Sequence, residues 1–190
     1  MGKPKITDKR WSIDLEKRIQ QEHYGDTYSK RYSFDPNSDR EIFVIDTPPP
    51  YPSGTWHIGA VAQYSMIDVI ARSQRLLGKE VYFPWGVDRN GINIEFTVEK
   101  KTGKKMRTFE RGNFIDICRD TIEEYTQAMR ETACRVGLSC SFENEYLTDS
   151  SEFRAVTQSI FVDLFKQGNI IEDLRPNIYD PVEGTTIADA

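Results

Sequence analysis

Apolar residues recur along the first half of the chain as two short runs and one helical stripe. Residues 42–45 and 80–83 are runs of β-formers bounded by charged residues and proline, as is typical of strands buried on both faces. Between them, apolar residues recur at helical spacing from about residue 56 to residue 77, and Gly78 is a natural helix end. Strand, helix and strand in this order predict a βαβ unit with a parallel sheet.

Helical periodicity continues on both sides of this unit. We predict an N-terminal helix over residues 11–23, followed by an extended polar linker to residue 40. Further on, helices are expected over 114–136 and 153–165, each ended by a glycine, and a third strand is expected to begin at residues 170–171. The order is α/β throughout. It predicts residues 1–40 as a helix and linker, and 41–190 as the domain proper.

Composition limits the class of protein. Hydrophobic residues make up 38% and charged residues 29%, a normal mixture for a soluble globular chain, and the net charge of −5 argues against a simple nucleic-acid-binding module. The three cysteines, Cys118, Cys134 and Cys140, include no Cys-x-x-Cys pair. They predict neither a disulfide framework nor a structural zinc site, and they fit the reducing cytoplasm. No signal peptide or apolar span predicts contact with a membrane.

The segment from Thr47 to Ala60, TPPPYPSGTWHIGA, is the first candidate for chemistry. It leads from a predicted strand into a helix, at the sheet edge where such folds bind ligands. A helix N-terminus there favours phosphate, Gly54 and Gly59 allow close approach of the backbone, and His57 can donate a hydrogen bond to developing charge. Position alone leaves a structural histidine and a common α/β turn as equally good interpretations.

This segment resembles the HIGH signature of class I aminoacyl-tRNA synthetases, with the Pro-Pro-Pro-x-x-x-Gly-x-x-His-x-Gly approach of the valine, isoleucine and leucine enzymes. His57, Ile58 and Gly59 match its first three residues, whereas Ala60 replaces its final histidine, so one phosphate contact attributed to the family is missing. The resemblance implies the first half of a Rossmann-like (HUP-type) nucleotide-binding fold. It implies His57 as the catalytic residue and an ATP site made of Ser53, Gly54, His57, Gly59 and Ala60.

A second segment, FPWGVDRNGINIE over residues 83–95, resembles the same family's Gly-x-Asp-x-x-Gly-x-x-x-Glu motif. In that motif the aspartate pairs with the α-ammonium group of the amino acid, so the resemblance assigns this role to Asp88. Without the resemblance, a loop aspartate that caps a helix is the simpler interpretation. Pro49, Pro50 and Tyr51 complete the implied amino-acid site.

The form of both motifs is most similar to the valine enzymes of the archaeal type, with isoleucine and leucine as alternatives. A rigid proline wall, with Trp85 nearby in sequence, suits a small branched side chain. A hydrophobic pocket separates side chains that differ by one methylene by only about 1–3 kcal/mol, so the motifs do not decide the substrate alone.

The resemblance also implies substrates and partners. ATP with Mg²⁺ and the amino acid would be substrates, and tRNA would bind through domains outside this chain. Residues 180–183 replace the Cys-x-x-Cys zinc knuckle of many relatives, so no zinc is implied, and residues 187–190 resemble the start of the family's editing insertion. No Lys-Met-Ser-Lys-Ser-like loop is present, so we expect the chain to need the remainder of a synthetase for aminoacylation.

Three other classes stay open from the sequence. A free-standing synthetase-like paralogue would bind an amino acid or adenylate without turnover. A different nucleotidylyl transferase of the same fold would show no dependence on an amino acid and no role for Asp88. A purely structural α/β domain would use neither motif.

Overall fold

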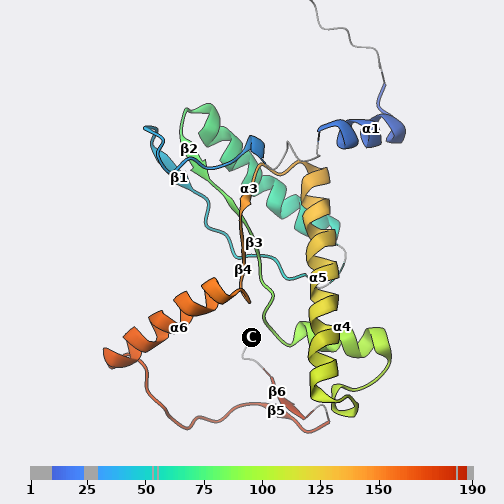
Figure 1. Cartoon of the computed structure of the whole chain (residues 1–190), viewed down its shortest axis with the longest axis vertical. Helices are drawn as coiled ribbons and strands as arrows, with labels where there is room; N and C mark the ends of the chain where they lie inside the picture. The colour runs from blue at the N-terminus through green and yellow to red at the C-terminus, as the bar shows by residue number, and fades with distance from the viewer. Residues whose placement is uncertain (1–9, 24–29, 53, 55, 183, 188–190) are drawn as a thin grey trace, which may run out of the picture. The chain divides into compact units, whose positions relative to one another are not determined.

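The computed structural model describes residues 10–23, 30–52, 54, 56–182 and 184–187 (Figure 1). The chain divides into two compact units, residues 1–150 and residues 151–190. Ser53 and the last three residues, two parts of the sequence to which the resemblance gave roles, lie outside the described residues.

The first unit contains the predicted βαβ arrangement. Strand β1 (Ile42–Val44) pairs in parallel with β2 (Glu80–Tyr82), and helix α3 (Ile58–Leu76) connects them and packs against β2. The α/β order and the parallel pairing are confirmed. The prediction that β1 is buried on both faces is wrong, because Ile42 is 49% and Val44 56% exposed. In the described part of the chain β1 pairs only with β2, and α3 covers β2.

A second parallel pair continues the first. Only Phe83 separates β2 from β3 (Pro84–Val87), so one extended segment pairs first with β1 and then with β4 (Ser141–Leu147) (Figure 1). The Phe83 carbonyl between the two pairs accepts a hydrogen bond of 2.7 Å from the Ser141 amide. Strand β4 was not predicted from the sequence.

Helices surround these strands. Helix α1 (Ile13–His23) confirms the predicted N-terminal helix, and α5 (Arg111–Val136) confirms the long helix that ends at Gly137. Two elements between β3 and α5 were not predicted: α4 (Asn93–Thr102), which packs against α5, and a 3₁₀ turn, η1 (Met106–Thr108).

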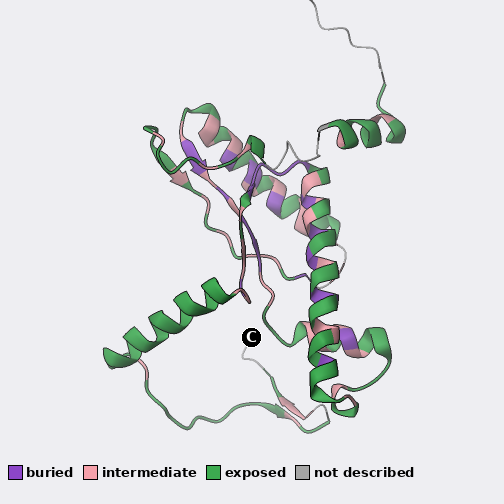
Figure 2. Cartoon of the chain, in the orientation of Figure 1, coloured by how far each residue is buried: buried purple, intermediate pink, exposed green. Residues whose placement is uncertain are grey.

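The core of the first unit lies along β2 and β3 and the helix faces turned towards them (Figure 2). Trp85 is 2% exposed and lies among the rings of Trp56, Tyr64 and Phe142, with ring centroids 5.5 to 6.5 Å from its own. The structure therefore places Trp85 in the hydrophobic core, whereas the sequence interpretation noted it near the proline wall of the amino-acid site.

A buried charged network joins α3 to the turn between α5 and β4. The Asp68 carboxylate, 6% exposed, accepts hydrogen bonds from the Ser139 amide (2.7 Å) and from the Arg72 Nε (2.7 Å), and also from the Ser139 hydroxyl. Arg72 also donates to the Gly137 carbonyl, and Arg75 donates to the Ser139 carbonyl at 2.8 Å. The network fixes the turn that leads into β4, at the end of the strand opposite to Thr148.

The second unit contains α6 (Ser151–Lys166) and an antiparallel pair, β5 (Tyr179–Asp180) with β6 (Thr185–Thr186). Helix α6 confirms the predicted helix. The predicted strand at residues 170–171 is wrong: these residues have no ladder partner, and Ile171 is 78% exposed. Among the described residues, none of the helices has the length and apolar character needed to cross a membrane.

Candidate active site

His57 lies where the sequence predicted it, at the N-terminus of α3. It is the N-cap residue in extended conformation, and its Nδ1 accepts a hydrogen bond of 3.0 Å from the Gly59 amide. Because Nδ1 is the acceptor, the neutral imidazole carries its proton on Nε2. Since the side chain is exposed, Nε2–H can donate to an anionic ligand beside the positive end of the helix.

The absence of a side chain at Gly59 leaves room for the imidazole ring of His57. A Cβ atom at position 59 would lie 2.8 Å from Cε1 and 3.0 Å from Nδ1 of the imidazole. A side chain at this position would therefore displace the ring from its cap. The sequence interpretation explained Gly59 by close approach of a nucleotide, but the nearest group in the structure is the histidine ring.

The proline-rich loop is tied to the end of β3 and to α3. The Asp88 amide donates to the Pro50 carbonyl at 2.9 Å, and the Tyr64 hydroxyl donates to the Pro48 carbonyl at 2.9 Å. These bonds bring the loop after β1 beside the loop after β3. Because both strands run in the same direction, the two motifs meet at one edge of the sheet.

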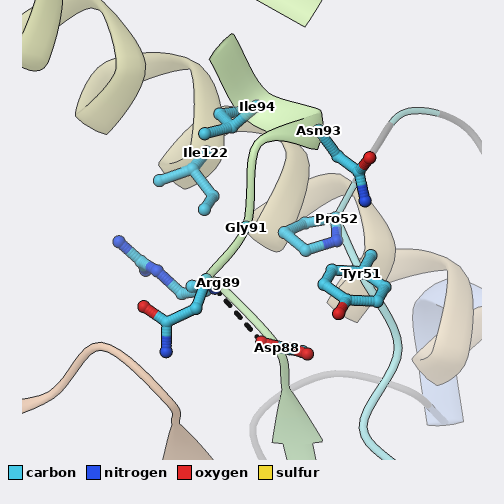
Figure 3. Close-up of a pocket in the computed structure, with 9 residues that line it drawn as sticks. Tyr51, Pro52, Asp88, Arg89, Gly91, Asn93, Ile94 and Ile122 are labelled. Carbon is cyan, nitrogen blue, oxygen red and sulfur yellow. Dashed lines mark hydrogen bonds between the residues drawn. The ribbon is translucent and has the colours of Figure 1, made fainter. Parts of the chain in front are cut away.

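Asp88 follows directly after β3, and its carboxylate is held in place. Its Oδ1 accepts hydrogen bonds from the Thr148 hydroxyl (3.0 Å) and from the Asn90 amide (3.1 Å). Tyr51 faces this carboxylate (Figure 3), and a hydrogen bond to Asp88, together with its negative charge, raises the pKa of the Tyr51 phenol. Asp88 thus lies at the junction of the two motif loops.

A small pocket lies around this junction (Figure 3). Its volume is about 10 Å³, roughly the space of one water molecule, so a larger ligand requires movement of a lining group. Tyr51, which is 49% exposed, is one lining group that can move. The lining combines one carboxylate with apolar and polar side chains from both loops, α4 and α5, namely Tyr51, Pro52, Asp88, Arg89, Asn90, Gly91, Asn93, Ile94 and Ile122.

The one cation in this lining is already neutralised. Arg89 forms ion pairs with Glu123 on α5 (2.8 Å) and with Asp149 after β4 (3.1 Å), and its side chain is only 9% exposed. Asp88 is therefore the carboxylate that faces the pocket without an arginine or lysine partner among the described residues. Such an arrangement favours a cationic group on a ligand.

Thr148 is a site residue that was not singled out from the sequence. Its hydroxyl donates to Asp88 and accepts from the Arg89 amide at 2.8 Å, while its own amide donates to the Val87 carbonyl at 3.2 Å. It is 8% exposed. No local motif marks this residue, because its role follows from the pairing of β3 with β4.

The remaining predicted site residues are only partly brought together. Tyr51 and Asp88 both line the pocket. Pro49 and Pro50 lie just before Tyr51 in the chain and do not line it, although the Pro50 carbonyl accepts the hydrogen bond from the Asp88 amide. Gly54 has a φ of 139°, a backbone conformation suited to glycine. Among the described residues, no cluster of three or more His, Cys, Asp or Glu side chains could hold a metal ion.

Known proteins match the chain over most of its length. Residues 19–190 match the family model of tRNA synthetases class I (I, L, M and V). The valine–tRNA ligase of Aeropyrum pernix is 40% identical over 99% of this chain, and that of Thermoplasma volcanium is 42% identical over 83%. A bacterial relative, the valine–tRNA ligase of Rickettsia akari, is 41% identical over 84% of this chain.

The chain spans only 23%, 20% and 20% of the lengths of these three relatives. Among solved structures, the ternary complex of Agrobacterium radiobacter K84 agnB2 LeuRS with tRNA and LeuAMS matches with a TM-score of 0.70 and 28% identity, over 90% of this chain and 20% of that one. This likeness confirms half of a Rossmann-like catalytic domain. The chain belongs to the class I tRNA synthetases of the I, L, M and V group.

Proposed function

We propose that residues 41–190 are the first half of the catalytic domain of a valine–tRNA ligase. In the proposed reaction, a carboxylate oxygen of valine attacks the α-phosphorus of ATP, and the bond to the bridging oxygen breaks with release of pyrophosphate. The resulting valyl-adenylate then gives its acyl group to a ribose hydroxyl at the 3′ end of tRNA, releasing AMP. The observation that carries this proposal is the oriented, cation-free Asp88 carboxylate beside the loop that leads to His57.

In this proposal Asp88 binds the α-ammonium group of valine. The Oδ1 hydrogen bonds from Thr148 and Asn90 fix the plane of the carboxylate before a ligand arrives. The Tyr51 hydroxyl already hydrogen-bonds to Asp88, and the ammonium group would bind the carboxylate beside this hydroxyl or in its place. The aliphatic side chains of Ile94 and Ile122 and the ring of Pro52 form the apolar part of the lining, which suits a small branched side chain.

The ATP side of the proposed site consists of Gly54, His57, Gly59 and Ala60, together with Ser53, which lies outside the described residues. The Nε2–H of His57, beside the positive end of the α3 dipole, would meet negative charge on the phosphates as pyrophosphate leaves. Ala60 has no side-chain donor and its amide already donates to the His57 carbonyl at 3.1 Å, so His57 is the side chain at this helix start that can donate to phosphate. Mg²⁺ would enter as the complex with ATP, held mainly by phosphate oxygens.

The relatives named valine–tRNA ligase favour valine over isoleucine and leucine. They also argue against an unrelated nucleotidylyl transferase. Equilibrium binding of valine to this chain tests the proposal directly: binding of valine, and weaker binding of the decarboxylated and deaminated analogues, is expected. Loss of affinity with the deaminated analogue reports the ammonium contact to Asp88.

His57→Ala is expected to weaken binding of a valyl-adenylate analogue by about 10- to 100-fold, because a hydrogen bond to a charged group contributes roughly 1.5–3 kcal/mol. Binding of valine alone should not change, since His57 is assigned to the phosphates. Isothermal titration calorimetry measures both. His23→Ala is the matched control, since the chain has two histidines and His23 lies at the far end of α1. Equal affinity of both variants for the analogue would contradict the role of His57.

Thr148→Val is expected to weaken valine binding about five- to tenfold, because one hydrogen bond that orients Asp88 is lost at nearly constant volume. Thr148→Ser keeps the hydroxyl and should restore most of the affinity. Valine titrations of the three proteins, together with their urea unfolding curves, separate positioning from stability. If Thr148→Val binds valine as tightly as the unchanged chain, the hydroxyl of Thr148 does not position Asp88 for the ligand.

A further inference from the structure

Positive charge is concentrated in one short segment of an otherwise acidic chain. Residues 99–111 contain six Lys or Arg and two Glu, a net charge of +4, whereas the whole chain has −5. The segment covers the end of α4, the turn η1 and the start of α5 (Figure 1). The proposed reaction on valine and ATP uses none of these residues.

The segment is folded by its own acidic residue. Glu99 accepts a hydrogen bond of 2.6 Å from the Met106 amide and pairs with Lys105 at 3.4 Å, and its side chain is 10% exposed. Helix α4 ends at Gly103, where φ is 68°. Glu99 therefore closes the loop 103–106 onto the helix and is not available to neutralise further cations.

Two lysines remain unpaired on this scaffold. Lys101 pairs with Glu124 at 2.8 Å and Lys105 pairs with Glu99, whereas the ammonium groups of Lys100 and Lys104 form no ion pair among the described residues. Both are exposed and line the same surface hollow of about 360 Å³. Two cations that line one hollow without ion-pair partners favour a ligand with repeated negative charges.

An aromatic ring lies in the same hollow. Phe96 is 39% exposed and lines the hollow with Glu99, Lys100, Gly103, Lys104 and Lys105. Lysines that meet phosphates beside a ring on which a base can stack are typical of single-stranded nucleic-acid contacts. An acidic peptide or an anionic lipid surface would use the lysines but would leave the ring without a specific role.

The hollow lies near the proposed site. Asn93, the first residue of α4, lines the Asp88 pocket, and the lining of the hollow follows the same helix from Phe96 to Gly103. At 1.5 Å per residue the hollow extends from about 5 to about 15 Å beyond Asn93, the reach of a few nucleotides. We infer that the hollow of Phe96, Lys100 and Lys104 binds the RNA backbone near the 3′ end of tRNA. This inference rests on the proposed function.

The test is binding of an in vitro transcript of a valine tRNA to the chain, measured by fluorescence anisotropy over a range of salt concentrations. In Lys100→Gln/Lys104→Gln, the slope of log K against log salt is expected to become shallower by about 1.4 to 1.8, because each phosphate contact contributes roughly 0.7–0.9. At about 0.1 M salt this is an affinity loss of roughly 25- to 60-fold. Phe96→Ala should weaken binding about fivefold or more without changing the slope.

The matched control is Arg154→Gln/Lys166→Gln on α6, which removes the same charge from another surface. An equal loss in the control, or an unchanged slope in the lysine variant, would overturn the inference. Loss of binding to phosphatidylserine vesicles, with RNA binding intact, would assign the hollow to a lipid surface and also overturn it. Valine titration of each variant distinguishes failure of this inference from failure of the proposed function. The lysine variant should bind valine as the unchanged chain does. Failure of the unchanged chain to bind valine counts against the proposed function alone.

Discussion

Asp88→Asn is expected to weaken valine binding at least roughly 30-fold, the largest effect on binding that we expect from a single substitution. Removing one partner of a desolvated, hydrogen-bonded charge pair costs about 2–5 kcal/mol. The asparagine keeps the size of the side chain and can accept from the Thr148 hydroxyl and the Asn90 amide, so the loop should keep its shape. Only the negative charge that faces the ammonium group is lost. Calorimetric titration with valine measures the effect.

The same variant offers a measurement that needs no ligand. Asp88 raises the pKa of Tyr51 by its hydrogen bond and its charge, because both stabilise the neutral phenol over the phenolate. Replacing the carboxylate by an amide should therefore lower the pKa of Tyr51. An ultraviolet titration of tyrosine ionisation, with Tyr51→Phe to identify the signal, reports this shift.

Asp116→Asn is the control for both measurements, since Asp116 is an exposed residue of α5 that pairs only with Arg119 in the described structure. It should change neither valine affinity nor the pKa of Tyr51. An Asp88→Asn protein that binds valine as tightly as this control would remove the ammonium role from Asp88. A lowered pKa of Tyr51 in that protein would still confirm the contact between the two side chains.

The elements predicted correctly from the sequence are those whose signal is local. The run 42–45, the helical stripe that follows and Gly78 lie close together in sequence, so one pattern contains both strands and their connection. The position of His57 at the helix start follows from the same pattern, because a tight proline and glycine loop leaves few places for the helix to begin. The resemblance then supplied a chemical role that position alone left open.

Strand β4 and Thr148 could not be found in this way. SFENEYL carries more polar than apolar residues, and its strand identity comes from pairing with β3, more than fifty residues earlier in the chain. The place of Trp85 could not be predicted for another reason. A tryptophan beside a motif is compatible both with the wall of a ligand site and with the core. Its contacts with Trp56, Tyr64 and Phe142, which are scattered along the chain, place it in the core.

The buried network around Asp68 shows the same limit for charged residues. Asp68 and Arg72 are four residues apart on α3, a spacing that in sequence indicates an ordinary surface pair. Only the turn at Gly137 and Ser139 buries the carboxylate, through contacts about seventy residues distant in the chain. On the surface this ion pair would contribute little to stability. In the folded chain it joins α3 to the start of β4.

Asp68→Ala is accordingly expected to lower the free energy of unfolding by about 1–3 kcal/mol, the cost of leaving a buried donor without its acceptor, since Arg72 is 42% exposed and solvent screens its charge. The Ser139 amide and hydroxyl would lose their acceptor, and Arg72 and Arg75 would face each other without the carboxylate between them. Burial already lowers the pKa of Arg75, and Asp68 opposes that effect. Urea unfolding followed by circular dichroism measures the change.

Asp116→Ala removes an exposed i,i+3 pair with Arg119 and should change stability by no more than about 0.5 kcal/mol. Asp68→Asn retains an acceptor for Ser139 and should lie between the two alanine variants. If Asp68→Ala unfolds at the same urea concentration as Asp116→Ala, the Asp68 network does not hold α3 to the turn before β4. Should Asp68→Ala prove too unstable to purify, the intermediate loss in Asp68→Asn still decides the question. A loss in that variant, without loss of valine binding per folded molecule, would show that the network stabilises the junction of α3 with the start of β4 and takes no part in the site.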